Sequence, residues 1–335
     1  MKAVRLYEKG VLRVEEVPSP GSPEPGWASL SVIMAGICGS DIHNFKTGQW
    51  ITRSPSIAGH EFTGVVTALG AGVENVQVGD IVAADSRFWC GHCDACQLGQ
   101  NHLCETLGFI GEACDGCFAE HVNLPAKLLH KVPSGLAPQI AAMAEPFAVA
   151  LHAVNRLRLK PHEPVLIVGC GPIGGLAAVI LAHQHQGPVI VVDRNARRAE
   201  RVAVATNAQV ATLDAKHIEE LLHGRKLTAA IDATGSIDAL QMLLNCVPSG
   251  ANIALVGISH GKLSFDPNLL VERELALIGC HAFQNEMPAA ISLLPTCAKM
   301  LNQLIDREIT LDEVPDAYAR IAANQVTGLK TLIHV

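Results

Sequence analysis

The chain has 335 residues, of which 49% are hydrophobic and 17% are charged, so it can bury two sizeable cores and is far from a disordered composition. Its formal net charge of −7 and the lack of a long Lys/Arg run argue against nucleic acid or an anionic membrane surface as a partner. Residues 1–17 alternate charged and apolar side chains, unlike a secretion signal, so we expect a soluble, cytoplasmic protein.

The N-terminal part of the chain predicts a β-rich domain. Short apolar runs at 28–36, 62–70 and 80–85 are interrupted by Gly, Pro and Asp, which is typical of strands joined by turns. From about residue 150 onward, strand-like and helix-like segments alternate. Strands are expected at 163–170, 188–195, 227–235 and 251–258, with helices at 171–186, 196–206 and 236–247.

This alternation indicates a parallel sheet covered by helices on both faces. The uncharged stretch 165–182 contains four glycines and Pro172, so a strand, a turn and a helix explain it better than a membrane span. A helix pattern at 288–304 and a strand pattern at 329–335 follow. We therefore predict an α/β protein with a β-rich domain formed by 1–150 together with 286–335, and a nucleotide-type domain at 151–285.

A dinucleotide site is predicted where the first strand of the parallel sheet ends. Gly169, Gly171 and Gly174 form G-x-G-x-x-G between a strand and a helix, which lets the backbone and the helix N-terminus approach a pyrophosphate. Asp193 closes the next strand, about twenty residues later, where a carboxylate would accept hydrogen bonds from a ribose and repel a 2′-phosphate. NAD is therefore favoured over NADP, although Arg194 and Arg198 follow closely. The alternative is a tight turn without a ligand.

Four cysteines lie close together at residues 90–104. Their spacing, C-x2-C-x2-C-x7-C, is open to four interpretations: a disulfide knot, a redox pair, an iron–sulfur cradle or a metal clamp. Eleven cysteines, an odd number, in a chain without an export signal argue against a disulfide framework. The last gap is too long for the bacterial ferredoxin pattern, and a redox pair needs only two thiols. Cys90, Cys93, Cys96 and Cys104 are therefore predicted to hold a structural zinc ion.

A second group of metal-binding residue types lies earlier in the chain. Residues 35–43 contain Cys38 and His43, and residues 58–64 contain His60 and Glu61. A Cys–His–carboxylate set suits a catalytic zinc ion, which keeps one position open. Taken singly, Cys38 also fits a buried apolar position, and His60 fits a hydrogen-bonded core histidine.

Six motifs occur in an order that resembles the zinc-dependent medium-chain dehydrogenases: GICGSDIH, GHEFTGVV, GVENVQVGD, CGHCDACQLGQNHLC, EPFAVALHAV and VGCGPIG. The similarity runs essentially from end to end, and is greatest to the branch with polyol (sorbitol-type), galactitol-phosphate, sugar-acid and threonine dehydrogenases. It implies a GroES-like catalytic domain, a Rossmann domain and two zinc ions per chain.

The resemblance also implies roles for single residues. Cys38, His60 and Glu61 would bind the catalytic zinc ion. Glu145 stands where classical alcohol dehydrogenases have a third cysteine, and would lie at the zinc ion or bind it through water. Ser40 and His43 would form a proton relay. The coenzyme-binding residues would be Gly169, Gly171, Pro172 and Gly174 in the loop at the pyrophosphate, Ile173, Asp193 and Arg198 on the adenosine side, and Val256, Gly257, Ile258, Cys280 and His281 on the nicotinamide side.

The predicted activity is zinc-dependent hydride transfer between NAD and a secondary alcohol of a polyol, a sugar phosphate or a sugar acid. Two alternatives are an L-threonine 3-dehydrogenase and a non-catalytic NAD- and zinc-binding module. Lys46, Arg53 and Arg87 are candidate contacts for a substrate anion, and solvated surface charge is the simpler interpretation of each. The family resemblance further implies a homodimer or homotetramer that pairs through the strand at 275–283. Cys114 and Cys117 are expected to be free thiols.

Overall fold

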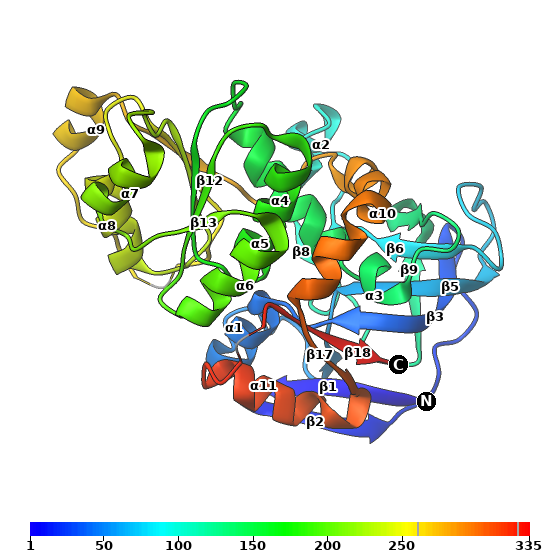
Figure 1. The fold of residues 1–335 in the computed structure, drawn as a ribbon. Coiled ribbons are helices and arrows are strands. Elements are labelled where there is room, and N and C mark those ends of the chain that lie inside the picture. The colour runs from blue at the N-terminus through cyan, green and yellow to red at the C-terminus, as the bar shows by residue number, and fades with distance from the viewer. Residues whose placement is uncertain (260, 327) are drawn as a thin grey trace.

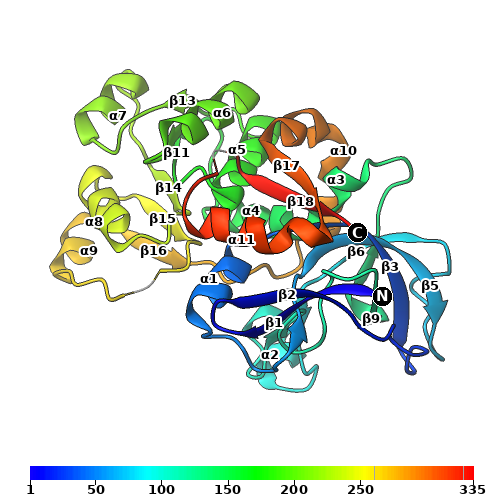
Figure 2. The same ribbon diagram turned by 90° about the horizontal axis from the view of Figure 1, so that it is seen from below.

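The computed structural model describes residues 1–259, 261–326 and 328–335. Figures 1 and 2 show two lobes side by side. One lobe contains the N-terminal strands and the last strand of the chain, and the other is a sheet flanked by helices. The α/β class and the GroES-like and Rossmann-like architecture predicted from the sequence are confirmed.

The first lobe is built on a seven-stranded sheet in which β3 occupies a central position. Side chains along β3 alternate between buried and partly exposed, as expected for a strand with one face on the core. The path β10-β6-β5-β3-β18-β17, with β9 also paired to β3, consists of β3 (Trp27–Gly36), β5 (Glu61–Leu69), β6 (Ile81–Ala84), β9 (His121–Pro125), β10 (Leu129–Lys131), β17 (Ile305–Thr310) and β18 (Lys330–His334).

Smaller strands and helices surround this sheet. β1 (Lys2–Glu8) pairs with β2 (Val11–Glu16) and β4 (Ser56–Ile57), and β7 (Arg87–Phe88) pairs with β8 (Gly108–Phe109). The helices are α1 (Gly39–Thr47), α2 (Asp94–Gln97), α3 (Pro138–Ala141), α4 (Ala144–Arg156) and α11 (Val314–Ala322). The strand pattern at 1–150 did not reveal α1, a short helix of low apolar content.

The second lobe is a six-stranded parallel sheet in the order β13-β12-β11-β14-β15-β16. Its central strands are apolar on both faces: Ile167 packs in the core beneath one helical layer, whereas the neighbouring Leu166 packs in the core on the opposite face. The strands are β11 (Val165–Val168), β12 (Val189–Val192), β13 (Gln209–Val210), β14 (Ala229–Asp232), β15 (Asn252–Leu255) and β16 (Ala276–Gly279), and the helices are α5 (Pro172–Gln184), α6 (Ala196–Thr206), α7 (Ala215–Leu222), α8 (Ile237–Cys246) and α9 (Asn268–Arg273).

The helix α10 (Met287–Leu304) lies at the seam between the lobes. It packs against α3 and α4 and also against α5 and α6 of the second lobe. The chain then returns to the first sheet, where β18 runs antiparallel to β3 with Ile333 opposite Ala35. None of the described helices combines the length and apolar character needed to cross a bilayer.

Gly174, the third glycine of the dinucleotide motif, packs closely against the backbone of Gly169, and this close packing can be tested. A Cβ atom on Gly174 would lie 1.8 Å from the carbonyl oxygen of Gly169, whereas a Cβ on Gly171 would meet nothing within 4 Å. We expect Gly174→Ala to lower the free energy of unfolding by at least about 2 kcal/mol. Gly171→Ala, the matched control, should change it by less than about 1 kcal/mol. Denaturant unfolding monitored by circular dichroism measures both, and equal stability of the two variants would contradict the prediction.

Candidate active site

Cys38, His60 and Glu61 meet because β3 and β5 pair antiparallel. Gly36, at the end of β3, lies opposite Glu61, at the start of β5. Cys38 follows β3 and caps the N-terminus of α1. As a result the thiol, the imidazole and the carboxylate have ligand atoms that all lie within 4.8 Å of one another. The sequence-predicted set is thus a cluster in space, with the sulfur, nitrogen and oxygen donors that suit zinc.

Asp41 orients two members of this cluster. Its Oδ1 lies 3.4 Å from His60 Nδ1, and its Oδ2 accepts a hydrogen bond from the Cys38 amide at 2.8 Å. Because Nδ1 faces the carboxylate, Nε2 is the ring nitrogen left for a metal ion. Ser40 Oγ lies 3.5 Å from His60 Nε2, on the same side as the cluster.

Glu61 is held by a lysine from the opposite end of the chain. Lys330, on β18, is 2% exposed and forms an ion pair with Glu61 Oε2, and its ammonium group also donates to the Ile37 carbonyl at 2.9 Å. The other oxygen, Glu61 Oε1, is buried and has no hydrogen-bond partner among the described residues. A buried carboxylate oxygen without a donor is costly unless a cation approaches it, so the residues present fit a divalent metal ion.

The electrostatics of the cluster link metal binding to proton release. Burial raises the pKa of the Cys38 thiol, and the nearby Glu61 charge adds to the effect. For His60, burial disfavours the charged ring, but Asp41 and Cys38 outweigh it and raise the pKa well above its usual range. A divalent cation reverses this preference by stabilising the thiolate and the neutral imidazole. Metal binding here should therefore release protons.

The four cysteines of residues 90–104 form a second cluster, and their sulfur atoms lie within 4.8 Å of one another. The backbone amides of His92 and Cys93 donate to Cys90 Sγ and lower the pKa of this thiol to about 6. Burial raises the pKa of Cys96 to about 12. Four converging sulfurs leave no position for a substrate, so this cluster fits a structural zinc ion that holds the surrounding loop.

A cleft of about 230 Å³ connects the first cluster with the second lobe. Cys38 and Lys46 line one side of it, and Pro172 and Arg198 line the other. Pro172 begins α5 directly after Gly171, whose missing Cβ would point into open space. The helix N-terminus, with its free N–H groups, therefore faces the same cleft as Cys38, as a pyrophosphate site requires.

Comparisons with known proteins agree with this arrangement. The alcohol dehydrogenase GroES-like domain matches residues 24–134, and the zinc-binding dehydrogenase family matches residues 173–296. The L-threonine 3-dehydrogenase of Deinococcus radiodurans is 32% identical over 82% of this chain and 80% of the relative. This chain belongs to the zinc-containing medium-chain alcohol dehydrogenase family.

Further relatives define the branch of the family. The sorbitol dehydrogenase of Bacillus subtilis (strain 168) is 28% identical over 100% of this chain and 97% of the relative. The crystal structure of an alcohol dehydrogenase from Escherichia coli CFT073, complexed with NADH, has a TM-score of 0.90 at 30% identity, and the match covers 100% of this chain and 99% of that one. The protein is thus a zinc-dependent NAD(P) alcohol dehydrogenase of the polyol and threonine branch.

Glu145 lies near the zinc cluster of this dehydrogenase without being part of it. It is 6% exposed near the start of α4, and its Oε1 accepts a hydrogen bond from Ser86 Oγ at 2.5 Å. Burial raises the pKa of Glu145 to about 7, and the neighbouring charges of His60 and Glu61 contribute in opposite directions. Among the described residues, the mutual cluster includes Cys38, His60 and Glu61 but not Glu145.

His43 occupies the turn of α1 that follows Ser40. Its Nε2 lies 3.0 Å from Gln49 Oε1 and 3.2 Å from Thr47 Oγ1, and its ring centroid lies 4.4 Å from that of Trp50. The side chain is 8% exposed. Its polar contacts therefore lead toward the half-exposed loop after α1.

Two residues predicted to bind the adenosine half, Asp193 and Arg198, form hydrogen bonds with the protein backbone. Asp193 accepts from the Cys170 amide with Oδ2 and from the Asn195 amide with Oδ1, both at 2.7 Å. Arg198 donates to the Val326 carbonyl at 3.1 Å, and its Nε is buried with no partner among the described residues. Asp193 thus fixes the glycine loop, while Arg198 borders the cleft.

The predicted nicotinamide-side residues lie at the ends of β15 and β16. The amides of Val256 and Gly257 both donate to the Asp232 carbonyl at 3.0 Å, and the Cys280 amide donates to the Leu255 carbonyl at 2.9 Å. His281 Nδ1 lies 3.0 Å from the His102 carbonyl, so it contacts the loop of the four-cysteine cluster. Ile258 is half exposed.

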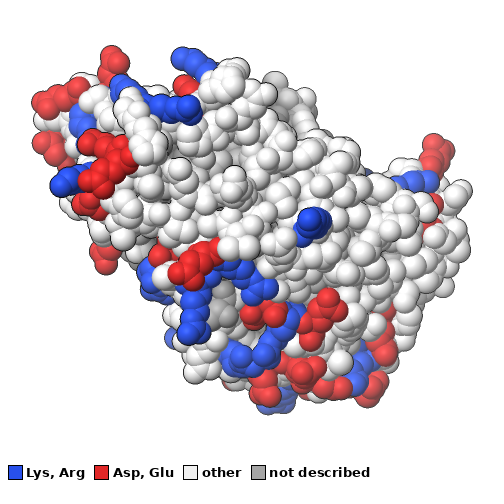
Figure 3. Space-filling view, in the orientation of Figure 1, with Lys and Arg blue, Asp and Glu red and all other residues white. Residues whose placement is uncertain are grey.

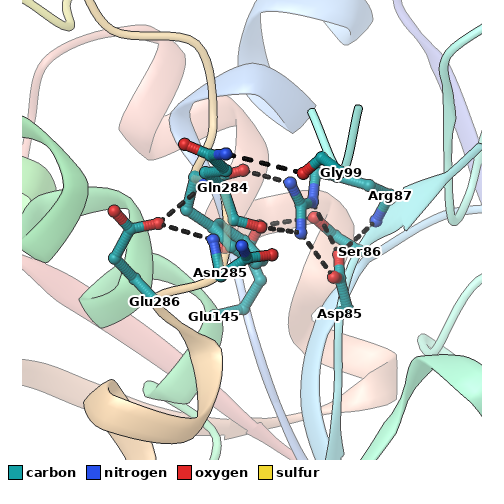
Figure 4. Close-up of polar contacts among 9 residues, drawn as sticks. Asp85, Ser86, Arg87, Gly99, Glu145, Gln284, Asn285 and Glu286 are labelled. Atoms are coloured by element: carbon teal, nitrogen blue, oxygen red, sulfur yellow. Dashed lines mark hydrogen bonds and ion pairs between the residues drawn. The ribbon is translucent and has the colours of Figure 1, made fainter. Parts of the chain in front are cut away.

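Arg87 is not a solvated surface charge, contrary to the simpler interpretation of the sequence. It is 2% exposed, pairs with Asp85 at 2.7 Å and donates to the carbonyls of Phe283 and Gln284 (Figure 4). Ser86, between Asp85 and Arg87, holds Glu145. This buried network therefore links Glu145 with the segment that leaves the second lobe, a role for which the sequence carries no local signal.

The other candidate charges remain near the surface. Arg53 pairs with Asp115 at 3.4 Å, and both side chains are about half exposed. Lys46 borders the cleft. Cys114 is partly exposed, and Cys117 is buried with Sγ 3.7 Å from the Glu61 carbonyl; both are free thiols, as expected. Figure 3 shows acidic and basic side chains intermixed over α11 and around α8 and α9 on this face, with few charges over α5 and α10.

The buried ion pair between Lys330 and Glu61 leads to a prediction about the free energy of unfolding. Lys330→Met leaves the Glu61 carboxylate buried without its ammonium partner, and should cost about 3–5 kcal/mol of unfolding free energy in the metal-free protein. The loss should be smaller in the zinc-loaded protein, because the cation takes over part of the compensation. Adding Glu61→Gln to Lys330→Met removes the orphaned charge and should recover part of the stability. Chemical unfolding of the chelated and zinc-loaded forms measures these differences, and equal losses in both forms would contradict the prediction.

Proposed function

We propose that this dehydrogenase transfers a hydride between NAD and a secondary alcohol of a polyol, a sugar phosphate or a sugar acid. The observation that carries the proposal is the shared cleft, which Cys38 and the N-terminus of α5 both border. A substrate hydroxyl at the Cys–His–Glu cluster would have its carbon facing the position of a nicotinamide ring. Zinc held by Cys38, His60 and Glu61 supplies Lewis acidity that makes a substrate hydroxyl more acidic.

The residues around the cluster would carry the proton of the substrate hydroxyl to solvent. Ser40 would accept the proton of the substrate hydroxyl and give its own hydroxyl proton to His43, which would pass a proton to solvent. Support comes from the 3.5 Å separation of Ser40 Oγ and His60 Nε2, and from the contact of His43 Nε2 with Gln49 at 3.0 Å. Lys330 holds Glu61 Oε2, which leaves Oε1 for the metal ion.

Glu145 takes part as an acid close to the metal ion, in contact with it directly or through water. Support comes from its burial, from its raised pKa of about 7, and from its electrostatic coupling to His60 and Glu61. The hydrogen bond from Ser86 holds one oxygen and leaves the other available. On the coenzyme side, Gly169, Gly171, Pro172 and Gly174 surround the pyrophosphate, and Ile173, Asp193 and Arg198 lie against the adenosine half. Val256, Gly257, Ile258, Cys280 and His281 flank the nicotinamide half.

We also propose how the chain divides into domains, how copies of it assemble, and where in the cell it is located. The NAD-binding domain spans 151–285, and the catalytic domain comprises 1–150 with 286–335, joined by α10 at the seam. β16 is the edge strand of the parallel sheet, and pairing with its copy would form the homodimer, alone or within a homotetramer. Eleven free cysteines suit the reducing environment of the cytoplasm.

The substrate class is tested by NAD reduction at about pH 9, where proton release favours oxidation. The panel contains polyols, sugar acids, sugar phosphates and L-threonine, each with and without a chelator. A chelator-sensitive signal confined to one carbohydrate class supports the proposal. A signal with L-threonine alone favours the alternative activity, which the identity to a threonine dehydrogenase supports. Silence across the panel from protein with two bound zinc ions would contradict the proposed substrates.

The proposed role of Asp193 leads to a prediction about the preference for NAD over NADP. Asp193→Ser removes the carboxylate that would accept bonds from the ribose, so kcat/KM for NAD should fall by about 10- to 100-fold. The same change removes the repulsion of a 2′-phosphate, so kcat/KM for NADP should rise. Asp214→Ser is the matched control, because Asp214 is likewise an aspartate of this lobe whose carboxylate accepts a hydrogen bond from a backbone amide, that of His217. A fall for NAD of similar size in Asp214→Ser would show that loss of packing, not of recognition, is responsible.

A further inference from the structure

A small cavity borders His60 of the Cys–His–Glu cluster, and its lining residues are different from those of the coenzyme cleft. Its volume is about 20 Å³, and we call it the rear cavity. Its polar lining residues are Asp41, Asn44, His60, Glu112 and Tyr318, and its remaining lining residues are Leu6, Leu12, Ala58, Gly59, Ile110 and Gly111. Five polar side chains around so small a space are unusual for an apolar packing defect, which would be lined by hydrocarbon.

Tyr318 gives an independent sign that the rear cavity holds a ligand. This residue of α11 is 1% exposed, and its ring packs edge-on against Phe45 at 5.5 Å and Phe118 at 6.4 Å. Its hydroxyl is buried and has no hydrogen-bond partner among the described residues. A buried hydroxyl normally has a partner, and the side chain of Tyr318 borders the rear cavity.

The size and chemistry of the rear cavity select the ligand. A single water molecule needs roughly 10–15 Å³ of such space and two to four polar partners, and about 20 Å³ is available. The phenol of Tyr318 can donate one hydrogen bond. Asp41 can accept one more, because its two oxygens have about four acceptor positions, and the protein contacts described above are to Cys38 and His60.

We propose that the rear cavity binds one structural water molecule, which accepts a hydrogen bond from Tyr318 and donates one to Asp41. Tyr318 is then a positioning residue for the metal site: it acts through the water on Asp41, and Asp41 orients His60 and the backbone of Cys38. This role rests on the proposed function of Cys38 and His60 as metal ligands. It also connects α11, from the C-terminal part of the chain, with the N-terminal half of the site.

The decisive variant is Tyr318→Phe in the zinc-loaded enzyme. If the hydroxyl binds water, its removal leaves the water and Asp41 under-bonded, so the Tm should fall by a few degrees. Loss of zinc from the Cys–His–Glu cluster to a chelator should accelerate by about tenfold, while zinc loss from the four-cysteine cluster stays unchanged. If the hydroxyl has no partner, Phe is the better residue there, and the Tm should stay equal or rise. That result, or a lower Tm with unchanged zinc loss, would overturn the proposal.

Thr228→Val is the matched control. Thr228 Oγ1 is also buried without a partner among the described residues, but Thr228 does not line the rear cavity. Its replacement should leave the Tm equal or slightly higher and zinc loss unchanged. The chelator experiment needs no substrate, so inactivity across the substrate panel would leave it interpretable. Failure of the cluster to bind zinc at all would instead count against the proposed function.

A high-resolution crystal structure completes the test. Density for one water molecule within hydrogen-bond distance of Tyr318 Oη and an Asp41 oxygen supports the proposal, and its disappearance in Tyr318→Phe adds to that support. A peak with several oxygen contacts at about 2.4 Å would identify a cation and overturn the assignment to water. An empty rear cavity in the parent enzyme would overturn it as well.

Discussion

The ion pair between Lys330 and Glu61 across Gly36 is the contact on which the metal site depends. Gly36 lies between the two side chains, and a Cβ atom there would come within 2.7 Å of both Glu61 Oε2 and Lys330 Cε. The glycine therefore lets β18, β3 and β5 bring an ammonium and a carboxylate together in the interior. Because Lys330 pairs with one oxygen of Glu61, the other oxygen can face a cation beside Cys38 and His60.

The two lobes contribute different parts of the reaction and share a buried apolar core at their seam. The first lobe contains the metal-binding residues, and the second presents the glycine loop and the N-terminus of α5 to the same cleft. Leu329 packs so closely on Gly175 that a Cβ there would lie 1.9 Å from it. On the other side Arg87 bonds to the segment after β16. Contacts of this kind restrict the movement of one lobe relative to the other, and a hydride donor and acceptor react only in a defined orientation.

The sequence predicted those parts of the molecule that local patterns encode. The strand at 163–170 and the following glycine-rich helix were found because apolar runs, glycines and Asp193 fall at the intervals that one βαβ unit requires. The metal-binding types at Cys38, His60 and Glu61 were recognised from residue chemistry, and their convergence follows from the β3–β5 register. Pairing register between strands is a long-range property, so only the resemblance to a family could predict it.

The supporting residues were missed because their partners are distant in the sequence. Lys330 and Ile37 are 293 positions apart. In the sequence Arg87 looks like a surface charge, and it is the segment after β16 that covers it. No local motif predicts such residues, because whether a lysine or arginine can be buried depends on the partner that neutralises its charge. The role of Asp41 could be predicted from the sequence, because this residue lies in the same motif as Cys38 and Ser40.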